Sequence, residues 1–72
     1  MSEYTVVIER SENNFGAWVP ALDGCVATGS TLEEVTTNIR EAIEFHIEGM
    51  VLAGEAVPVP SLAIVTTIQV AS

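Results

Sequence analysis

Apolar and polar residues alternate in the first third of this chain, and the spacing then changes to three and four residues in the middle third. Residues 4–10 and 15–19 both alternate at period two and are rich in β-forming side chains, which predicts two strands joined by the polar turn 11–14. Asp23-Gly24 provides a second turn before a third short strand over 25–28. The first 28 residues therefore predict a three-stranded antiparallel meander.

A helix start follows in Gly29-Ser30-Thr31-Leu32-Glu33-Glu34, where a capping hydroxyl precedes a glutamate by three residues. Two registers fit, Ser30 with Glu33 and Thr31 with Glu34. An apolar stripe then recurs at helical spacing, formed by Leu32, Val35, Ile39, Ile43, Ile47 and Met50. This pattern predicts one long amphipathic helix that ends near Leu52, with Gly54 as the stop signal.

The last segment returns to β-type composition. The prolines in Val57-Pro58-Val59-Pro60 require an extended backbone, and Leu62–Val70 is rich in Ile, Val and Thr, which predicts a fourth strand. The predicted order is β-β-β-α-β, a single α+β domain in which one helix covers one face of the meander. Because the other face also carries apolar residues such as Val7, Trp18 and Val65, we expect a homo-oligomer, either a dimer or a tetramer.

Composition narrows the possible partners. A chain of 72 residues has room for one core, so residues 1–72 are expected to form one domain. The formal charge of −8 comes from ten acidic residues against Arg10 and Arg40. That balance argues against direct nucleic-acid binding and favours a basic protein partner, although an acidic surface can also serve solubility alone.

One cysteine and no signal peptide or long apolar run predict a cytoplasmic protein that does not enter a membrane.

Residues that could carry chemistry are few. The strand interiors hold no carboxylate, so the metal site of a nuclease is not expected, and Glu9 and Asp23 lie at a strand end and in a turn. His46 falls within the apolar stripe and Cys25 has no neighbouring base, so both are interpreted as core residues. We therefore predict no catalytic residue, no metal ligand, no cofactor and no enzymatic activity.

Candidate contact residues lie instead on the polar side of the helix. The residues predicted to bind a partner are Glu34, Glu41, Glu44, Phe45, Glu48 and, on the second strand, Trp18. Phe45 projects away from the apolar stripe, where it either anchors an interface or is covered by residues 55–61. Trp18 poses the same choice between core and interface.

An ordered set of motifs along nearly the whole chain resembles the HicB antitoxin family. The motifs are Tyr4-Thr5-Val6-Val7, Pro20-Ala21-Leu22-Asp23-Gly24-Cys25, Gly29-Ser30-Thr31-Leu32-Glu33-Glu34, Ile39-Arg40-Glu41-Ala42, and Gly54-Glu55 with Pro58. The resemblance implies a partial ribonuclease-H-like fold that lacks the catalytic carboxylates. It also implies a partner: HicB proteins bind HicA, a small basic ribonuclease with a double-stranded-RNA-binding fold and a catalytic histidine.

The sequence departs from this family in two ways. Full-length antitoxins continue into a helix-turn-helix or ribbon-helix-helix module, whereas this chain stops at Ser72, so no C-terminal DNA-binding domain is expected. In addition, Ala21, Asp23, Ser30 and Val35 replace the more usual Asp, Pro, Asp and Ala, each in a compatible turn, cap or helix position. The expected function is neutralisation of a HicA-type toxin by protein contact. The alternative is a homo-oligomeric structural or regulatory domain without a toxin.

Overall fold

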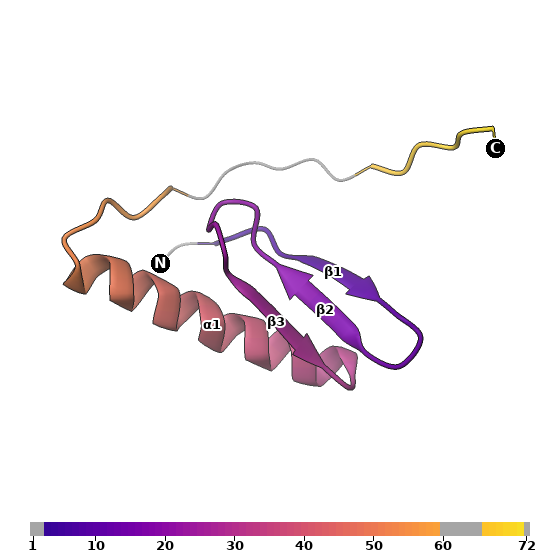
Figure 1. Cartoon of the computed structure of the whole chain (residues 1–72), viewed down its shortest axis with the longest axis horizontal. Helices are drawn as coiled ribbons and strands as arrows, with labels where there is room; N and C mark the ends of the chain where they lie inside the picture. The colour runs from indigo at the N-terminus through magenta and orange to yellow at the C-terminus, as the bar shows by residue number, and fades with distance from the viewer. Residues whose placement is uncertain (1–2, 60–65, 72) are drawn as a thin grey trace.

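The computed structural model describes residues 3–59 and 66–71. Strands β1 (Val7–Arg10), β2 (Phe15–Trp18) and β3 (Val26–Gly29) form an antiparallel sheet in the order β1-β2-β3, and helix α1 (Leu32–Leu52) follows. The helix packs along one face of the sheet (Figure 1). The predicted α+β class, with a meander and one long helix, is confirmed, and each strand agrees with its predicted range to within three residues at either end.

The strand register assigns residues to the two faces of the sheet, because directly opposed residues in an antiparallel pair share a face. Ala17 lies opposite both Ile8 and Ala27, and it is buried against the helix. Trp18 lies opposite both Val7 and Val26 on the other face. Both faces therefore carry apolar residues, and only one is covered by the helix.

A compact turn joins β2 to β3. The N–H of Leu22 donates to the carbonyl of Val19, and the N–H of Cys25 donates to the carbonyl of Leu22, each at 3.1 Å. Gly24 has φ of 80°, a left-handed backbone that glycine adopts without steric cost. These bonds turn Leu22 inward to become one of the most buried residues of the domain.

Both ends of α1 are capped as the sequence predicts, and the structure selects one of the two starting registers. Thr31 Oγ1 accepts from the Glu34 N–H at 3.0 Å, and Glu34 Oε1 accepts from the Ser30 N–H at 2.9 Å. At the other end, Gly54 has φ of 75°, and the Glu55 N–H donates to the Met50 carbonyl at 2.9 Å. This is the glycine-terminated bonding pattern that satisfies the last carbonyls of a helix.

The core forms where the first half of α1 crosses the sheet. Its buried residues are Ala17, Val19, Leu22, Cys25, Val35 and Ile39. Gly29 allows the close approach of β3 to the helix, because a Cβ at this position would lie 2.5 Å from the Val35 nitrogen. The interpretation of Cys25 as a core residue is confirmed.

The predicted fourth strand differs from the structure. Leu62–Val65 lie outside the described residues, and residues 66–70 form no strand in the single chain. Ile68 and Val70 are 76% and 74% exposed. A high β-propensity favours a strand only where a neighbouring strand accepts its backbone hydrogen bonds, and residues 66–70 have no such neighbour among the described residues.

Candidate protein-binding surfaces

The outer face of α1 carries a line of carboxylates. Glu34, Glu41 and Glu48 are spaced by seven residues, which places them nearly above one another at 3.6 residues per turn. Glu44 lies beside this line, and all four side chains are exposed. With no basic residue in the last turn of the helix, this face presents an acidic surface to any partner.

Phe45 lies within the acidic face. It is four residues after Glu41 and three before Glu48, so it neighbours both on the helix surface. Its side chain is 79% exposed, and Leu52, one heptad further along, is 81% exposed. The described part of the segment that follows the helix does not cover Phe45. We define the acidic face by Glu41, Glu44, Phe45, Glu48 and Leu52.

Glu34 differs from the other carboxylates of the helix because its charge already has a local role. Its side chain accepts from the Ser30 N–H and so completes the N-terminal cap. The Asn38 side chain also holds this end of the helix, donating from Nδ2 to the Thr28 carbonyl at 2.9 Å. The Asn38 bond ties the helix to β3, and the acidic face points away from the sheet because Val35 and Ile39, on the opposite side of the helix, are buried against it.

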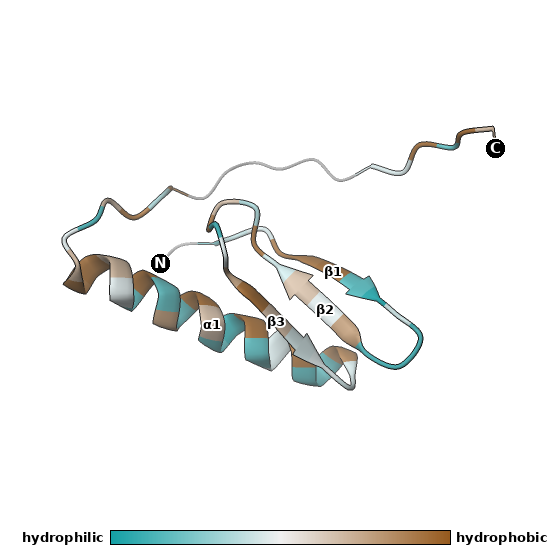
Figure 2. Ribbon diagram, viewed as in Figure 1, coloured by the Kyte–Doolittle hydropathy of each residue, from teal (hydrophilic) through white to brown (hydrophobic). Residues whose placement is uncertain are grey.

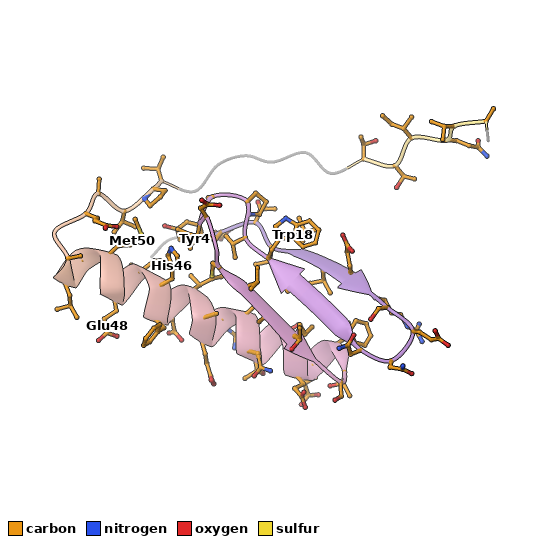
Figure 3. All side chains as sticks on the ribbon, viewed as in Figure 1. Tyr4, Trp18, His46, Glu48 and Met50 are labelled. Carbon is orange, nitrogen blue, oxygen red and sulfur yellow. The ribbon has the colours of Figure 1, made fainter. Side chains whose placement is uncertain are left out.

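Trp18 lies on the other side of the molecule. It forms a cross-strand row with Val7 and Val26 on the uncovered face of the sheet and is 37% exposed. An open hollow of about 670 Å³ adjoins it, lined in part by Glu9, Asp23 and Thr28. Figure 3 shows the Trp18 and Glu48 side chains pointing to opposite sides of the domain. The six predicted contact residues therefore belong to two surfaces and not to one.

Sequence reasoning missed Val26 as a member of the open sheet face. It read residues 25–28 as a strand, but the face of each residue depends on the register against β2, which pairs Val26 with Trp18. The alternation of Val26 with the buried Cys25 was the available signal. Val26 is 65% exposed, so it enlarges the apolar surface around Trp18.

His46 and Cys25 are the side chains considered above as candidates for catalysis. His46 is half-buried on α1, about one turn before Met50, and is not among the fully buried residues of the core. Cys25 is buried in the core, and burial raises the pKa of its thiol above its ordinary value. Within residues 3–59 and 66–71, no three His, Cys, Asp or Glu side chains are grouped closely enough to hold a metal ion.

In the same residues no helix has the length and apolar character needed to cross a membrane.

Comparison with known proteins places this arrangement in a family. The family model described as the HicB_like antitoxin of bacterial toxin-antitoxin systems matches residues 4–70. The chain belongs to the HicB-like antitoxin family. Its fold is similar to a chain of the solved HicA3 and HicB3 toxin-antitoxin complex, with a TM-score of 0.71 and 30% identity, over 83% of this chain and 70% of that chain.

Curated relatives include phage and cyanobacterial proteins. An uncharacterized 14.9 kDa protein of Haemophilus phage HP1 is 42% identical over 76% of this chain, and a UPF0150 protein of Synechocystis is 39% identical over 85%. The match spans 41% of the phage protein and 78% of the cyanobacterial one. The matched region is thus less than half of the phage protein and most of the cyanobacterial protein.

Proposed function

We propose that this chain is the toxin-binding module of a HicB-type antitoxin and neutralises a small basic HicA-type RNA-cleaving toxin through the acidic face of α1. The observation that carries the proposal is Phe45, a large aromatic side chain that is 79% exposed between exposed carboxylates. Family membership and the similarity to a chain of a HicA3 and HicB3 complex support the choice of partner.

The acidic face has the chemistry that a basic protein requires. Carboxylates at Glu41, Glu44 and Glu48 steer a cationic partner and select it by charge complementarity. Exposed Phe45 and Leu52 supply the apolar contact that long-range charge cannot provide, and aromatic residues are frequent energetic anchors of interfaces. Such a face would neutralise an RNA-cleaving toxin by occupying the basic surface that its RNA substrate needs. In this mechanism the chain binds and carries out no reaction itself.

The first experiment is charge reversal on the acidic face. The chain is co-expressed with the product of the neighbouring small gene, and binding is measured by titration calorimetry together with RNA cleavage by the partner. We expect Glu41→Lys with Glu48→Lys to weaken binding by about tenfold or more, because two attractive contacts become repulsive. RNA cleavage should return at concentrations where the unmodified chain suppresses it.

A matched control separates a defined interface from a general effect of charge. Glu9→Lys with Glu12→Lys changes the net charge by the same amount, at exposed positions on β1 and its turn. This pair should bind with nearly unchanged affinity. An equal loss in both pairs would show non-specific attraction, which would overturn the assignment of the acidic face. Glu34 is left out because reversing it would also remove a helix-capping bond.

Phe45→Ala and Trp18→Ala then distinguish the two candidate surfaces. If the acidic face binds the toxin, Phe45→Ala should lower the affinity by about tenfold or more, and Trp18→Ala should leave it nearly unchanged. The reverse result would move the toxin contact to the open sheet face. We propose Trp18, with Val7 and Val26, as a second contact surface that the toxin does not occupy.

A further inference from the structure

The hollow beside Trp18 has a floor made of strand backbone. Gly16 lies opposite both Glu9 and Thr28 in the register, and these three residues line the hollow of about 670 Å³ together with Trp18. A glycine inside a strand leaves room for another molecule to approach the backbone closely. A Cβ built at Gly16 would meet no atom within 4 Å, so this room is open. The hollow thus lies between side chains of β1 and β3, with the β2 backbone beneath it.

Trp18 provides an aromatic wall beside this floor. It lies two residues after Gly16 on β2, so both residues are on the same face of the sheet. Trp18 is 37% exposed, so part of it is open to a partner. Indole attracts a cation over its face more strongly than the other aromatic side chains do. The hollow therefore has one surface that suits a positively charged group.

Two carboxylates add negative charge to the hollow. Glu9 and Asp23 both line it and are both exposed. The backbone on either side of Asp23 is fixed, because the Leu22 N–H donates to the Val19 carbonyl and the Cys25 N–H donates to the Leu22 carbonyl. Figure 2 shows β1 changing from hydrophobic at its start to hydrophilic at its end. The hollow therefore combines apolar surface with carboxylates that need little rearrangement to bind.

The chain's own arginines lie elsewhere. Arg10 and Arg40 are its only Lys or Arg residues. Arg10 lies on the helix side of the sheet, with its Cζ 5.9 Å from the centre of the Phe15 ring. Arg40 lines a separate groove of about 570 Å³, between α1 and the segment that leads into β1. Neither arginine lines the hollow, so an arginine that matches its charge has to come from another molecule.

We propose that the hollow binds an arginine side chain from a segment of a second protein other than the toxin, with the guanidinium against Trp18 and its charge matched by Glu9 and Asp23. A guanidinium is planar, stacks on aromatic faces and donates to carboxylates in a fixed fork, whereas the ammonium of lysine is a compact and strongly hydrated charge. The exposed Val26 beside Trp18 can pack against the apolar stem of the arginine.

The inference rests on the proposed assignment of the open sheet face as a surface that the toxin does not occupy. Trp18 and Glu48 point to opposite sides of the domain (Figure 3), so the hollow and the acidic face are far enough around the domain to bind different molecules. The hollow then gives a specific chemistry to the second surface. It recognises an arginine-bearing segment and leaves the acidic face to the toxin.

The first test titrates the isotope-labelled chain with the capped tripeptide Gly-Arg-Gly and follows the amide signals of Gly16 and Thr28 by NMR. The chain has one tryptophan, so the indole N–H signal of Trp18 reports on the same site. The control peptide carries citrulline, which has the shape of arginine without its charge. We expect saturable shifts with the arginine peptide, affinity lower by about threefold or more with a lysine peptide, and no shift with citrulline. Shifts that do not saturate, or that are equal with citrulline, would overturn the proposal.

A pair of charge-removing substitutions then locates the peptide. Glu9→Gln with Asp23→Asn should weaken binding by about tenfold, because both charge-assisted contacts are lost while the side-chain shapes are kept. Glu41→Gln with Glu48→Gln removes the same charge from the acidic face and should change the affinity by less than about twofold. An equal loss in both pairs would show general attraction to an acidic protein. A loss only in the second pair would place the peptide on the acidic face. Either result overturns the assignment.

Filling the floor of the hollow tests its shape. Gly16→Val should weaken binding by about tenfold or more, because the new side chain would occupy the space between Glu9 and Thr28. The fold should tolerate valine, since a Cβ at this position meets no atom and valine favours strands. Trp18→Leu is a second variant that keeps an apolar side chain and removes the ring, and it should show a similar loss. Unchanged affinity in a folded form of either variant would overturn the proposal.

The last measurement separates this partner from the toxin. The peptide titration is repeated on the complex of the chain with the product of the neighbouring small gene, and the affinity should be unchanged. Displacement of the peptide by that protein would overturn the assignment of the hollow to a second partner, while toxin binding itself would stand. If no such complex forms, the proposed function fails, but the titrations of the chain alone still decide whether the hollow binds arginine.

Discussion

The two halves of α1 differ sharply in how they are packed. In the first half, Val35 and Ile39 are buried against the sheet, and Gly29 lets the backbone of β3 approach the helix closely. In the second half, Ile43 and Ile47 of the apolar stripe are only half-buried against the core, and Phe45 and Leu52 on the outer side are exposed. The comparison shows that the folding core of the chain is concentrated at one end of the helix. The other end retains apolar surface that is suited to contacts with a partner.

The largest expected effect comes from a substitution that blocks the close contact between β3 and the first half of α1. Gly29→Ala should lower the free energy of unfolding by about 3 kcal/mol, because the new Cβ would overlap the backbone of Val35 and force β3 away from α1. Urea denaturation monitored by circular dichroism measures the change. Gly16→Ala is the control, since no atom lies within 4 Å of a Cβ built there. Similar losses in both variants would show that β3 and α1 are not in tight contact.

One substitution made at both ends of the helix tests the comparison directly. Val35→Ala should cost about 2 kcal/mol, since it removes two buried methyl groups and leaves a small cavity. Val51→Ala should change stability by no more than about 0.5 kcal/mol, because Val51 is 62% exposed. Both values come from the same denaturation measurement. Val51 lies on the outer side of the helix, so an equal cost at the two positions would mean that this side is buried in solution as Val35 is.

A substitution at Gly49 is expected to raise the stability of the domain and not to lower it. It lies inside α1 and is exposed, and a Cβ added at this position would meet no atom within 4 Å. Gly49→Ala should raise the free energy of unfolding by about 1 kcal/mol, because alanine loses less backbone entropy in a helix. The urea midpoint should rise accordingly. A fall in the midpoint would show that the last turns of the helix are not formed in solution.

The smallest expected effect is a dependence on alkaline pH. Burial raises the pKa of the Cys25 thiol, so the folded chain holds this proton more tightly than the unfolded chain does. Stability from this difference is present below the unfolded pKa of about 8.5 and is lost as pH rises through the folded value. Comparing Cys25→Ala with the native chain at pH 7 and pH 10 isolates the contribution. A native chain that loses no more stability than the variant between these pH values would contradict it.

Particular elements show how far sequence reasoning reaches. A capping box at the start of the helix and the stop at Gly54 were predictable because these bonds join residues close in sequence, but the structure selected Thr31 with Glu34 over Ser30 with Glu33. The position of Phe45 around the helix predicted that it lies outside the apolar stripe. It did not predict that the described part of residues 55–61 leaves Phe45 uncovered. The open-face row of Val7, Trp18 and Val26 needed the strand register, which joins residues far apart in the chain. A strand was predicted for residues 62–70, and the described part of it, residues 66–70, has no strand partner among the described residues of the single chain.

The sequence by itself determined the meander, the long helix and its end near Leu52, its acidic side and the resemblance to HicB antitoxins. All of these follow from local hydrogen bonding, from hydrophobic periodicity or from an ordered set of motifs. The tertiary structure alone decided that the helix lies over β2 and β3, so that a groove remains beside β1. It also decided that Trp18 and the acidic face lie on opposite sides of the domain. Packing between distant segments sets such features, because it depends on shapes that no local pattern encodes.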